Sequence, residues 1–205
     1  EPSDLTAVLF DGVDRIQHLC WHLVHRDSRD RSTSAAHEAT RARVLQDFRE
    51  VDGYVDALIA QAGPGVNCMI VSDHGFTAAG PRIFYANTFL EQLGLLGWKP
   101  DTPFDTQGRV ALDENTEAST LIDWSRTRAY SLSSSSNAIF IRQAQAPGEP
   151  GVPAEEYVVF RDALVRDLLA LRDPETGAQV VSRVYTREEA FPGVCSAEAP
   201  DLTLA

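Results

Sequence analysis

The side chains best suited to bind a metal ion occur as two close pairs, Asp14 with His18 and Asp73 with His74. An α-helix has about 3.6 residues per turn, so two residues four positions apart lie one above the other and can bind one cation. Asp73 and His74 are adjacent and precede Gly75, which permits a tight turn that brings both side chains to one ion. Carboxylate oxygens and imidazole nitrogens suit zinc. These four residues are therefore the candidate metal ligands.

Each pair follows a short apolar run that predicts a buried strand. Residues 5–10 precede Asp14, and residues 66–71 precede Asp73. Both runs are typical of strands buried on two faces of a parallel sheet. Ligands of α/β domains gather at the carboxyl ends of such strands, so we expect the two pairs to share one crevice.

Helical and strand patterns alternate along the rest of the chain. Apolar residues at intervals of three and four predict helices over residues 14–24, 35–62, 87–96 and 155–172, the first and third with Asp14 and Asn87 at the N-cap. Short apolar runs predict strands over residues 138–141, 180–185 and 201–205. Residues 97–115, rich in Pro, Gly and Asp, predict a surface-loop insertion. The alternation predicts one α/β domain over residues 1–205, a three-layer sandwich around a mostly parallel sheet.

Charge and composition exclude several classes of protein. The 205 residues are 43% hydrophobic and 23% charged, which is typical of a globular domain. A net charge of −12 argues against a protein that coats nucleic acid or binds an anionic membrane surface. No apolar run approaches the roughly 20 residues that cross a bilayer. The three cysteines form no Cys-x-x-Cys spacing and are expected to be buried, reduced thiols, which favours a cytoplasmic location.

Three stretches of the sequence resemble the alkaline phosphatase superfamily. They are residues 10–21, residues 71–76, which read Val-Ser-Asp-His-Gly-Phe, and residues 123–131, which begin Asp-Trp-Ser-Arg-Thr-Arg. Residues 87–96 and the closing Ala-Pro-Asp-Leu at 199–202 extend the likeness over essentially the whole chain. The branch that the chain is most similar to comprises the type I phosphodiesterase/nucleotide pyrophosphatase proteins and their predicted phosphohydrolase/phosphomutase relatives.

The resemblance implies an alkaline-phosphatase-like fold and a binuclear metal site. Asp14 and His18 would belong to one metal, and Asp73 and His74 to the other. Two cations about 3.5–4 Å apart can stabilise the attacking and leaving oxygens of a phosphoryl displacement. The expected activity is hydrolysis of small phosphate esters, namely phosphodiesters or nucleotide pyrophosphates. The expected cofactors are two divalent ions, zinc or manganese, since Asp/His sets accept both.

The chain also departs from the pattern of that superfamily. Such enzymes take a further Asp and a Ser or Thr nucleophile from a strand and helix start that precede these motifs, and a last His from a segment after the Ala-Pro-Asp-Leu strand. No His follows His74 here. We therefore expect the chain to correspond to a central-to-C-terminal portion of the fold, and to be metal-deficient and inactive in isolation, because catalytic zinc normally has three protein ligands.

Other interpretations of the same residues stay open. The competing function is that of a non-catalytic phosphatase-like module that binds metal weakly or forms an interaction surface. His18 and His22 form an H-x-x-x-H pair, but Leu19 stands where a metalloprotease helix carries its Glu. Asp11 competes with Asp14 for the first metal, although only Asp14 has a His one turn later.

Overall fold

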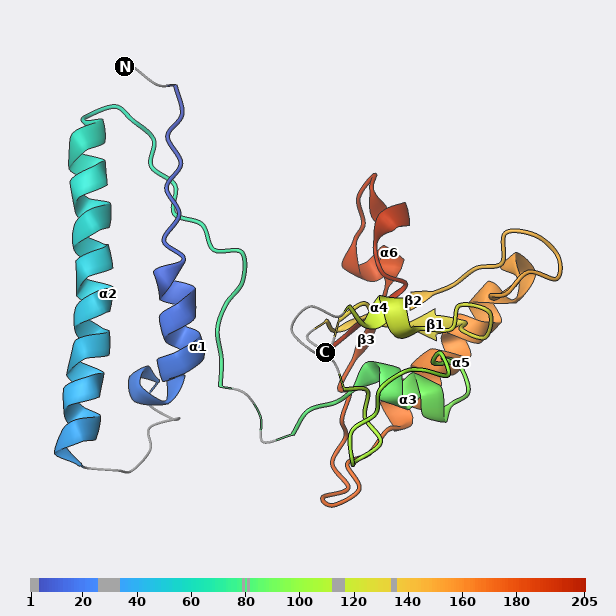
Figure 1. Cartoon of the computed structure of the whole chain (residues 1–205). Coiled ribbons are helices and arrows are strands. Elements are labelled where there is room, and N and C mark those ends of the chain that lie inside the picture. The colour runs from blue at the N-terminus through green and yellow to red at the C-terminus, as the bar shows by residue number, and fades with distance from the viewer. Residues whose placement is uncertain (1–3, 26–33, 79, 81, 112–116, 134–135) are drawn as a thin grey trace. The chain divides into compact units, whose positions relative to one another are not determined.

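The computed structural model describes residues 4–25, 34–78, 80, 82–111, 117–133 and 136–205 (Figure 1). The chain divides into two compact units, Glu1–Pro81 and Arg82–Ala205, which are called the N-terminal and the C-terminal unit below. The single domain expected over residues 1–205 therefore stays a prediction. None of the helices in these described ranges is long and apolar enough to cross a membrane.

Two helices that pack against each other form most of the N-terminal unit: α1 (Gly12–Val24) and α2 (Ala35–Ala62). The Ser34 hydroxyl accepts a hydrogen bond from the backbone N–H of His37 and caps the start of α2. Gly63, at φ 82°, ends the helix in a conformation that suits glycine. Both predicted helices are confirmed, although Asp14 lies inside the first turn of α1 rather than at its N-cap.

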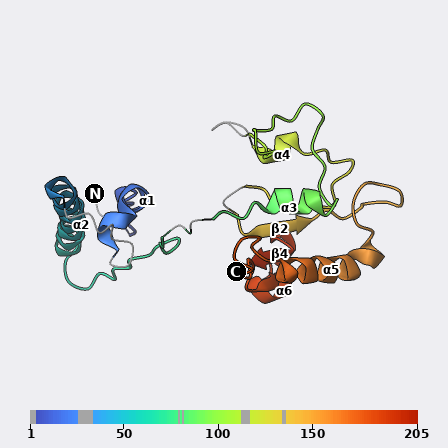
Figure 2. The same ribbon diagram turned by 90° about the horizontal axis from the view of Figure 1, so that it is seen from below.

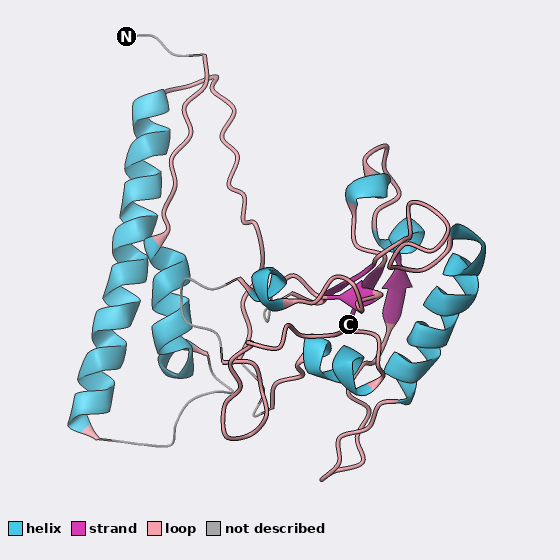
Figure 3. Ribbon diagram, turned by 45° about the vertical axis from the view of Figure 1, so that its right-hand side comes forward, coloured by secondary structure: helices cyan, strands magenta, loops and turns pink. Residues whose placement is uncertain are grey.

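The two apolar runs predicted to be buried strands are extended, but within the described residues neither is paired in a sheet (Figure 3). Their side chains are correspondingly exposed, with Leu9 at 87% and Met69 at 84% of full exposure. The prediction of a mostly parallel central sheet is therefore not confirmed in the described part of the chain. An apolar run specifies a strand only together with a hydrogen-bonding partner, and the pattern of one segment carries no information about that partner.

The sheet lies in the C-terminal unit and is antiparallel throughout its described part. Its strands are β1 (Ala129–Tyr130), β2 (Ala138–Ile141), β3 (Val184–Thr186) and β4 (Leu202–Leu204). Their order is β1-β2-β4-β3, and all three pairings are antiparallel. The predicted strands at 138–141 and 201–205 are confirmed, and the one at 180–185 is displaced toward the C-terminus. Helix and sheet together keep the α/β character.

Helices cover this small sheet on both sides (Figure 2). In Figure 2, α3 (Ala86–Gln92) lies on one side, and α5 (Tyr157–Ala170) and α6 (Arg187–Ala190) lie on the other, while α4 (Ala118–Leu121) lies beyond α3. Short 3₁₀ turns are found at Ala154–Glu156 and Ser196–Glu198. The prediction for α3 was too long, because Gly94 turns the chain at φ 68°. Asn87 is not its N-cap either. The Asn87 side chain instead exchanges two hydrogen bonds with the backbone of Ser131 and ties α3 to the end of β1.

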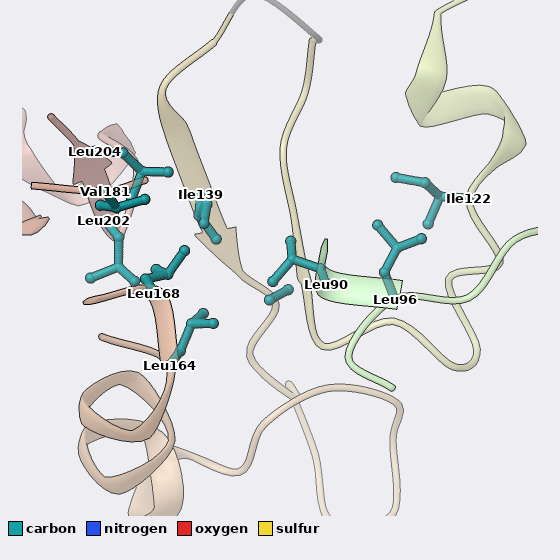
Figure 4. Close-up of a cluster of buried hydrophobic side chains, with 10 residues drawn as sticks. Leu90, Leu96, Ile122, Ile139, Leu164, Leu168, Val181, Leu202 and Leu204 are labelled. Carbon is teal, nitrogen blue, oxygen red and sulfur yellow. The ribbon is translucent and has the colours of Figure 1, made fainter. Parts of the chain in front are cut away.

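The core of the C-terminal unit forms where α3, α5 and the sheet meet (Figure 4). Ile139 of β2 lies between Leu90 of α3 and Leu202 of β4, and Leu164 and Leu168 extend the cluster from α5. All five side chains are almost completely buried. Burying an aliphatic side chain of this size stabilises the fold by about 1.5–3 kcal/mol, so this cluster anchors the unit.

A buried carboxylate joins the core to the surrounding helices. Asp201 is 1% exposed and accepts hydrogen bonds from the Ile141 backbone N–H at 2.6 Å, the Tyr157 hydroxyl at 2.5 Å and the Arg187 guanidinium at 2.6 Å. Such a charge is tolerated in the interior only because it is paired and hydrogen-bonded. The Asp of the closing Ala-Pro-Asp-Leu stretch is therefore a structural centre of this unit.

Two further expectations concern the cysteines and the loop. All three cysteines are free, but only Cys20 is half-buried, while Cys68 and Cys195 are exposed. The expected burial is wrong for these two, in the case of Cys68 because its segment is not covered by a sheet. Residues 97–111 contain no helix or strand, only isolated bridges such as that between Phe104 and Val110, and residues 112–116 lie outside the described part. That they form an insertion stays a prediction.

Candidate metal centre

The first candidate pair lies at the start of α1. Asp14 and His18 are one turn apart, and Oδ1 of Asp14 is 3.5 Å from Nε2 of His18. Asp11, the competing carboxylate, is engaged elsewhere, because its Oδ2 accepts a hydrogen bond from Nε of Arg15 at 2.9 Å. The helix thus presents Asp14, and not Asp11, to the histidine.

The second pair lies in a turn that its own hydrogen bonds define. The Ser72 hydroxyl donates to the carbonyl oxygen of His74 at 2.6 Å, and the backbone N–H of His74 donates to Oδ1 of Asp73 at 3.2 Å. Nδ1 of His74 lies 2.8 Å from the carbonyl oxygen of Gly75, so it carries the proton of that hydrogen bond. Nε2 of His74 is consequently the nitrogen that can accept a proton or a metal ion.

The fold of the N-terminal unit brings the two pairs together. Nε2 of His74 lies 3.9 Å from Oδ1 of Asp14 and 3.7 Å from Oδ2 of Asp73. Nε2 of His74 thus lies near both carboxylates, and Oδ1 of Asp14 lies near both histidines. The four side chains that we expected to share one crevice lie close together in the N-terminal unit, but they are largely exposed and no sheet of the described structure positions them.

The electrostatics of the cluster favour a positive charge at its centre. The pKa of His74 is raised, chiefly by the hydrogen bond to the Gly75 carbonyl and next by the Asp73 carboxylate, with a smaller contribution from Asp14. Oδ1 of Asp14 is buried and accepts no hydrogen bond in the described structure. A buried oxygen without a donor is costly, and a bound cation would satisfy it.

The distances fit a metal site that is only partly formed. Two ligand atoms on a tetrahedral zinc ion are separated by about 3.3 Å, close to the 3.5 Å between Oδ1 of Asp14 and Nε2 of His18. Among the residues that the structure describes, however, no group of three or more His, Cys, Asp or Glu side chains is arranged so that it could hold a metal ion. The types of side chain and the oxygen without a hydrogen bond therefore fit a metal ion, but the described residues do not form a complete set of ligands around one.

Sequence reasoning missed two aromatic residues that border the cluster. The Phe76 ring contacts the His18 imidazole edge to face, with ring centroids 4.8 Å apart, and lies 5.2 Å from the ring of Trp21. Trp21 stacks on His25 at 4.9 Å. Phe76 belongs to the stretch 71–76 that resembles the superfamily. Residue spacing could not predict its role, because its partners lie on α1, which is far away in the sequence.

The remaining histidines do not extend the cluster. His22 is exposed on α1, and its nearest ring partner is His37 of α2, with centroids 6.5 Å apart. The alternative zinc site formed by His18 and His22 is therefore not supported by a further ligand in the described structure, and His18 lies next to Asp14 instead.

A separate hollow of about 120 Å³ lies within the C-terminal unit, between the start of α3 and the 105–110 loop. Its charged groups are already paired, since Arg109 donates to Asp105 at 2.8 Å and 2.7 Å. Asn87, also in its wall, is bound to Ser131. Among the described residues, the Asp/His cluster therefore offers a ligand more polar side chains without a strong hydrogen bond than this hollow does.

Comparison with known proteins gives one match. The family model described as type I phosphodiesterase / nucleotide pyrophosphatase matches residues 1–205, the whole chain. Neither curated proteins nor solved structures give a match.

Proposed function

The chain belongs to the type I phosphodiesterase/nucleotide pyrophosphatase family, and we propose that the full-length protein hydrolyses phosphate esters with a binuclear centre of divalent metal ions. The family supports phosphoric ester hydrolysis and small phosphate-ester or nucleotide substrates in general. The proposal narrows this to phosphodiesters or nucleotide pyrophosphates. It assigns Asp14 and His18 to one cation, Asp73 and His74 to the other, and zinc or manganese as the metal.

The proposal rests on the environment of Oδ1 of Asp14. This oxygen is buried, accepts no hydrogen bond from any residue in the described part of the chain, and lies within 4 Å of Nε2 of both His18 and His74. A carboxylate oxygen is an acceptor, so an imidazole Nε2 is a favourable neighbour when it carries a proton or when a cation lies between the two atoms. The position is therefore suited to a metal ion.

Each ligand is oriented by a neighbouring group. The α1 helix fixes the one-turn offset of Asp14 and His18. The Gly75 carbonyl holds the proton of His74 on Nδ1, which leaves Nε2 as the ligand atom, as a backbone carbonyl commonly does behind a metal-binding histidine. When bound, two cations would stabilise the negative charge that develops on the attacking and leaving oxygens. Further ligands must complete each shell, because two protein ligands hold a catalytic zinc ion poorly.

Hydrolysis of a phosphodiester provides the test. The full-length protein, loaded with zinc or manganese, is assayed on bis(4-nitrophenyl) phosphate beside His18→Ala and Asp73→Ala, with His22→Ala as the matched control on the same helix. We expect each ligand substitution to lower kcat/KM by at least about 100-fold, while His22→Ala leaves it unchanged. Turnover that survives both ligand substitutions would overturn the assignment. Metal binding without any hydrolysis would favour the non-catalytic module.

A further inference from the structure

The Phe76 side chain links the two segments that carry the candidate ligands. We propose that Phe76 is a positioning residue that holds the His18 imidazole toward Asp14 and so pre-forms the metal centre before metal binds. The inference rests on the proposed function, because it concerns the same four ligands. It adds a residue that does not bind the metal itself.

The packing of Phe76 differs from that of its neighbours. Over residues 71–78 every other side chain is exposed, and Phe76 alone is half-buried. Its partners are His18, at a centroid distance of 4.8 Å and an interplanar angle of 84°, and Trp21, at 5.2 Å. The turn with Asp73 and His74 is therefore held against α1 by one aromatic ring.

The partners of Phe76 lie on the same stripe of α1 as the first ligand pair. Asp14, His18 and Trp21 follow one another at spacings of four and three, so they share one face of the helix, and His25 lies just beyond its end. Trp21 is itself fixed by its stack on His25, with an interplanar angle of 13°. Phe76 thus contacts a supported aromatic surface next to the ligands.

The contact matters because Asp14 does not fix the imidazole. The Oδ1 to Nε2 distance of 3.5 Å in that pair is longer than a strong charge-assisted hydrogen bond, so the His18 ring needs another contact to hold its orientation. An edge-to-face contact supplies one, since the positive edge of one ring meets the negative face of the other. A pre-oriented ligand loses less conformational entropy when it binds a metal.

The test compares Phe76→Leu, which keeps apolar bulk but removes the ring, with Phe76→Tyr, which keeps the ring. Phe84→Leu in the C-terminal unit is the control, because Phe84 also makes an edge-to-face contact, with Phe89. Two quantities are measured: the zinc dissociation constant by calorimetry, and, in the metal-free protein, the NMR shifts of the His18 ring protons and their nuclear Overhauser effects to residue 76. Helix content is followed by circular dichroism.

We expect Phe76→Leu to raise the zinc dissociation constant about tenfold and to move the His18 ring resonances toward those of a free imidazole, with helix content unchanged. Phe76→Tyr and Phe84→Leu should behave as wild type. Zinc affinity that is normal in Phe76→Leu, or equally weak in both Phe76 variants, would overturn the positioning role.

The Asp14→Ala variant separates this result from the proposed function. If wild type binds zinc, Asp14→Ala abolishes binding and Phe76→Leu is normal, the metal centre stands and only the role of Phe76 is wrong. If Asp14→Ala binds zinc as tightly as wild type, the proposed centre is wrong and the positioning role falls with it.

Discussion

Nε2 of His74 lies 3.9 Å from Oδ1 of Asp14, although one residue belongs to a turn after α2 and the other to the first turn of α1. The same oxygen lies 3.5 Å from Nε2 of His18. Two motifs that are far apart in the sequence thus meet at one carboxylate oxygen. Substitutions at this oxygen and in the core of the C-terminal unit measure what each contributes to metal binding and to stability.

Asp14 is expected to contribute to metal binding rather than to the stability of the metal-free fold. Its Oδ1 is buried and accepts no hydrogen bond among the described residues, which costs about 1–3 kcal/mol and offsets the about 0.3–1 kcal/mol that a first-turn carboxylate gains from the helix dipole. Thermal unfolding of metal-free Asp14→Ala should therefore show a Tm equal to or above that of wild type. Zinc should raise the Tm of wild type only. A marked loss of stability without zinc would contradict this, and Asp11→Ala, at an exposed ion pair, is the control.

Loss of Asp201 is expected to destabilise the C-terminal unit severely. Asp201→Ala leaves the Arg187 guanidinium, the Tyr157 hydroxyl and the Ile141 N–H without their acceptor. Breaking a buried ion pair from one side costs about 3–5 kcal/mol. Urea unfolding measures the loss, with Asp162→Ala as the control, since its pair with Arg161 is half-exposed and contributes at most about 1 kcal/mol. Similar stabilities of the two variants would refute the structural role of Asp201.

The stability of the fold should fall at high pH partly because of Tyr157. Burial, followed by the hydrogen bond to Asp201, raises the pKa of Tyr157 to about 12, above its ordinary value of 10.0. The unfolded chain therefore loses this proton first as the pH rises. The stabilising contribution is complete below about pH 10 and is lost as the pH rises through about 12. Urea unfolding over this range should show a steeper loss for wild type than for Tyr157→Phe, and equal slopes would disprove the shift.

Gly151 is expected to tolerate no side chain. Its φ is 133°, and a Cβ atom would lie 2.7 Å from the backbone N of Ala144 and 2.9 Å from the carbonyl oxygen of Arg142. Gly151→Ala should lower the free energy of unfolding by more than about 2 kcal/mol, because the clash is with backbone. Gly108→Ala, at φ 72° with open space around it, should cost only about 1 kcal/mol. Equal costs in urea unfolding would show that the backbone clash relaxes.

Most of the features that the sequence predicted correctly have local causes. The bounds of α2 follow from the Ser34 cap and from Gly63, and the Asp14–His18 pair follows from the helical period. Pairing of strands is different, since it depends on segments distant in the chain. The runs at 5–10 and 66–71 have the composition of strands without a partner in the described structure, whereas β2 and β4 pair across a long stretch of chain.

The candidate site shows the same division between local and distant causes. The four candidate ligands are predicted from two short motifs and from a family resemblance, and the whole-chain match confirms the family. The approach of His74 to Asp14, the sharing of one oxygen and the contact between Phe76 and His18 depend on how the turn packs on α1. No periodicity in the sequence encodes that packing.

The most direct test of the central claim is anomalous diffraction at the zinc absorption edge from crystals of the zinc-loaded protein. The account predicts one zinc peak bonded to Asp14 and His18 and a second bonded to Asp73 and His74, with about 4 Å between them. Zinc bound only at other residues, such as the His22 and His37 pair, or no peak at any of the four ligands would contradict it.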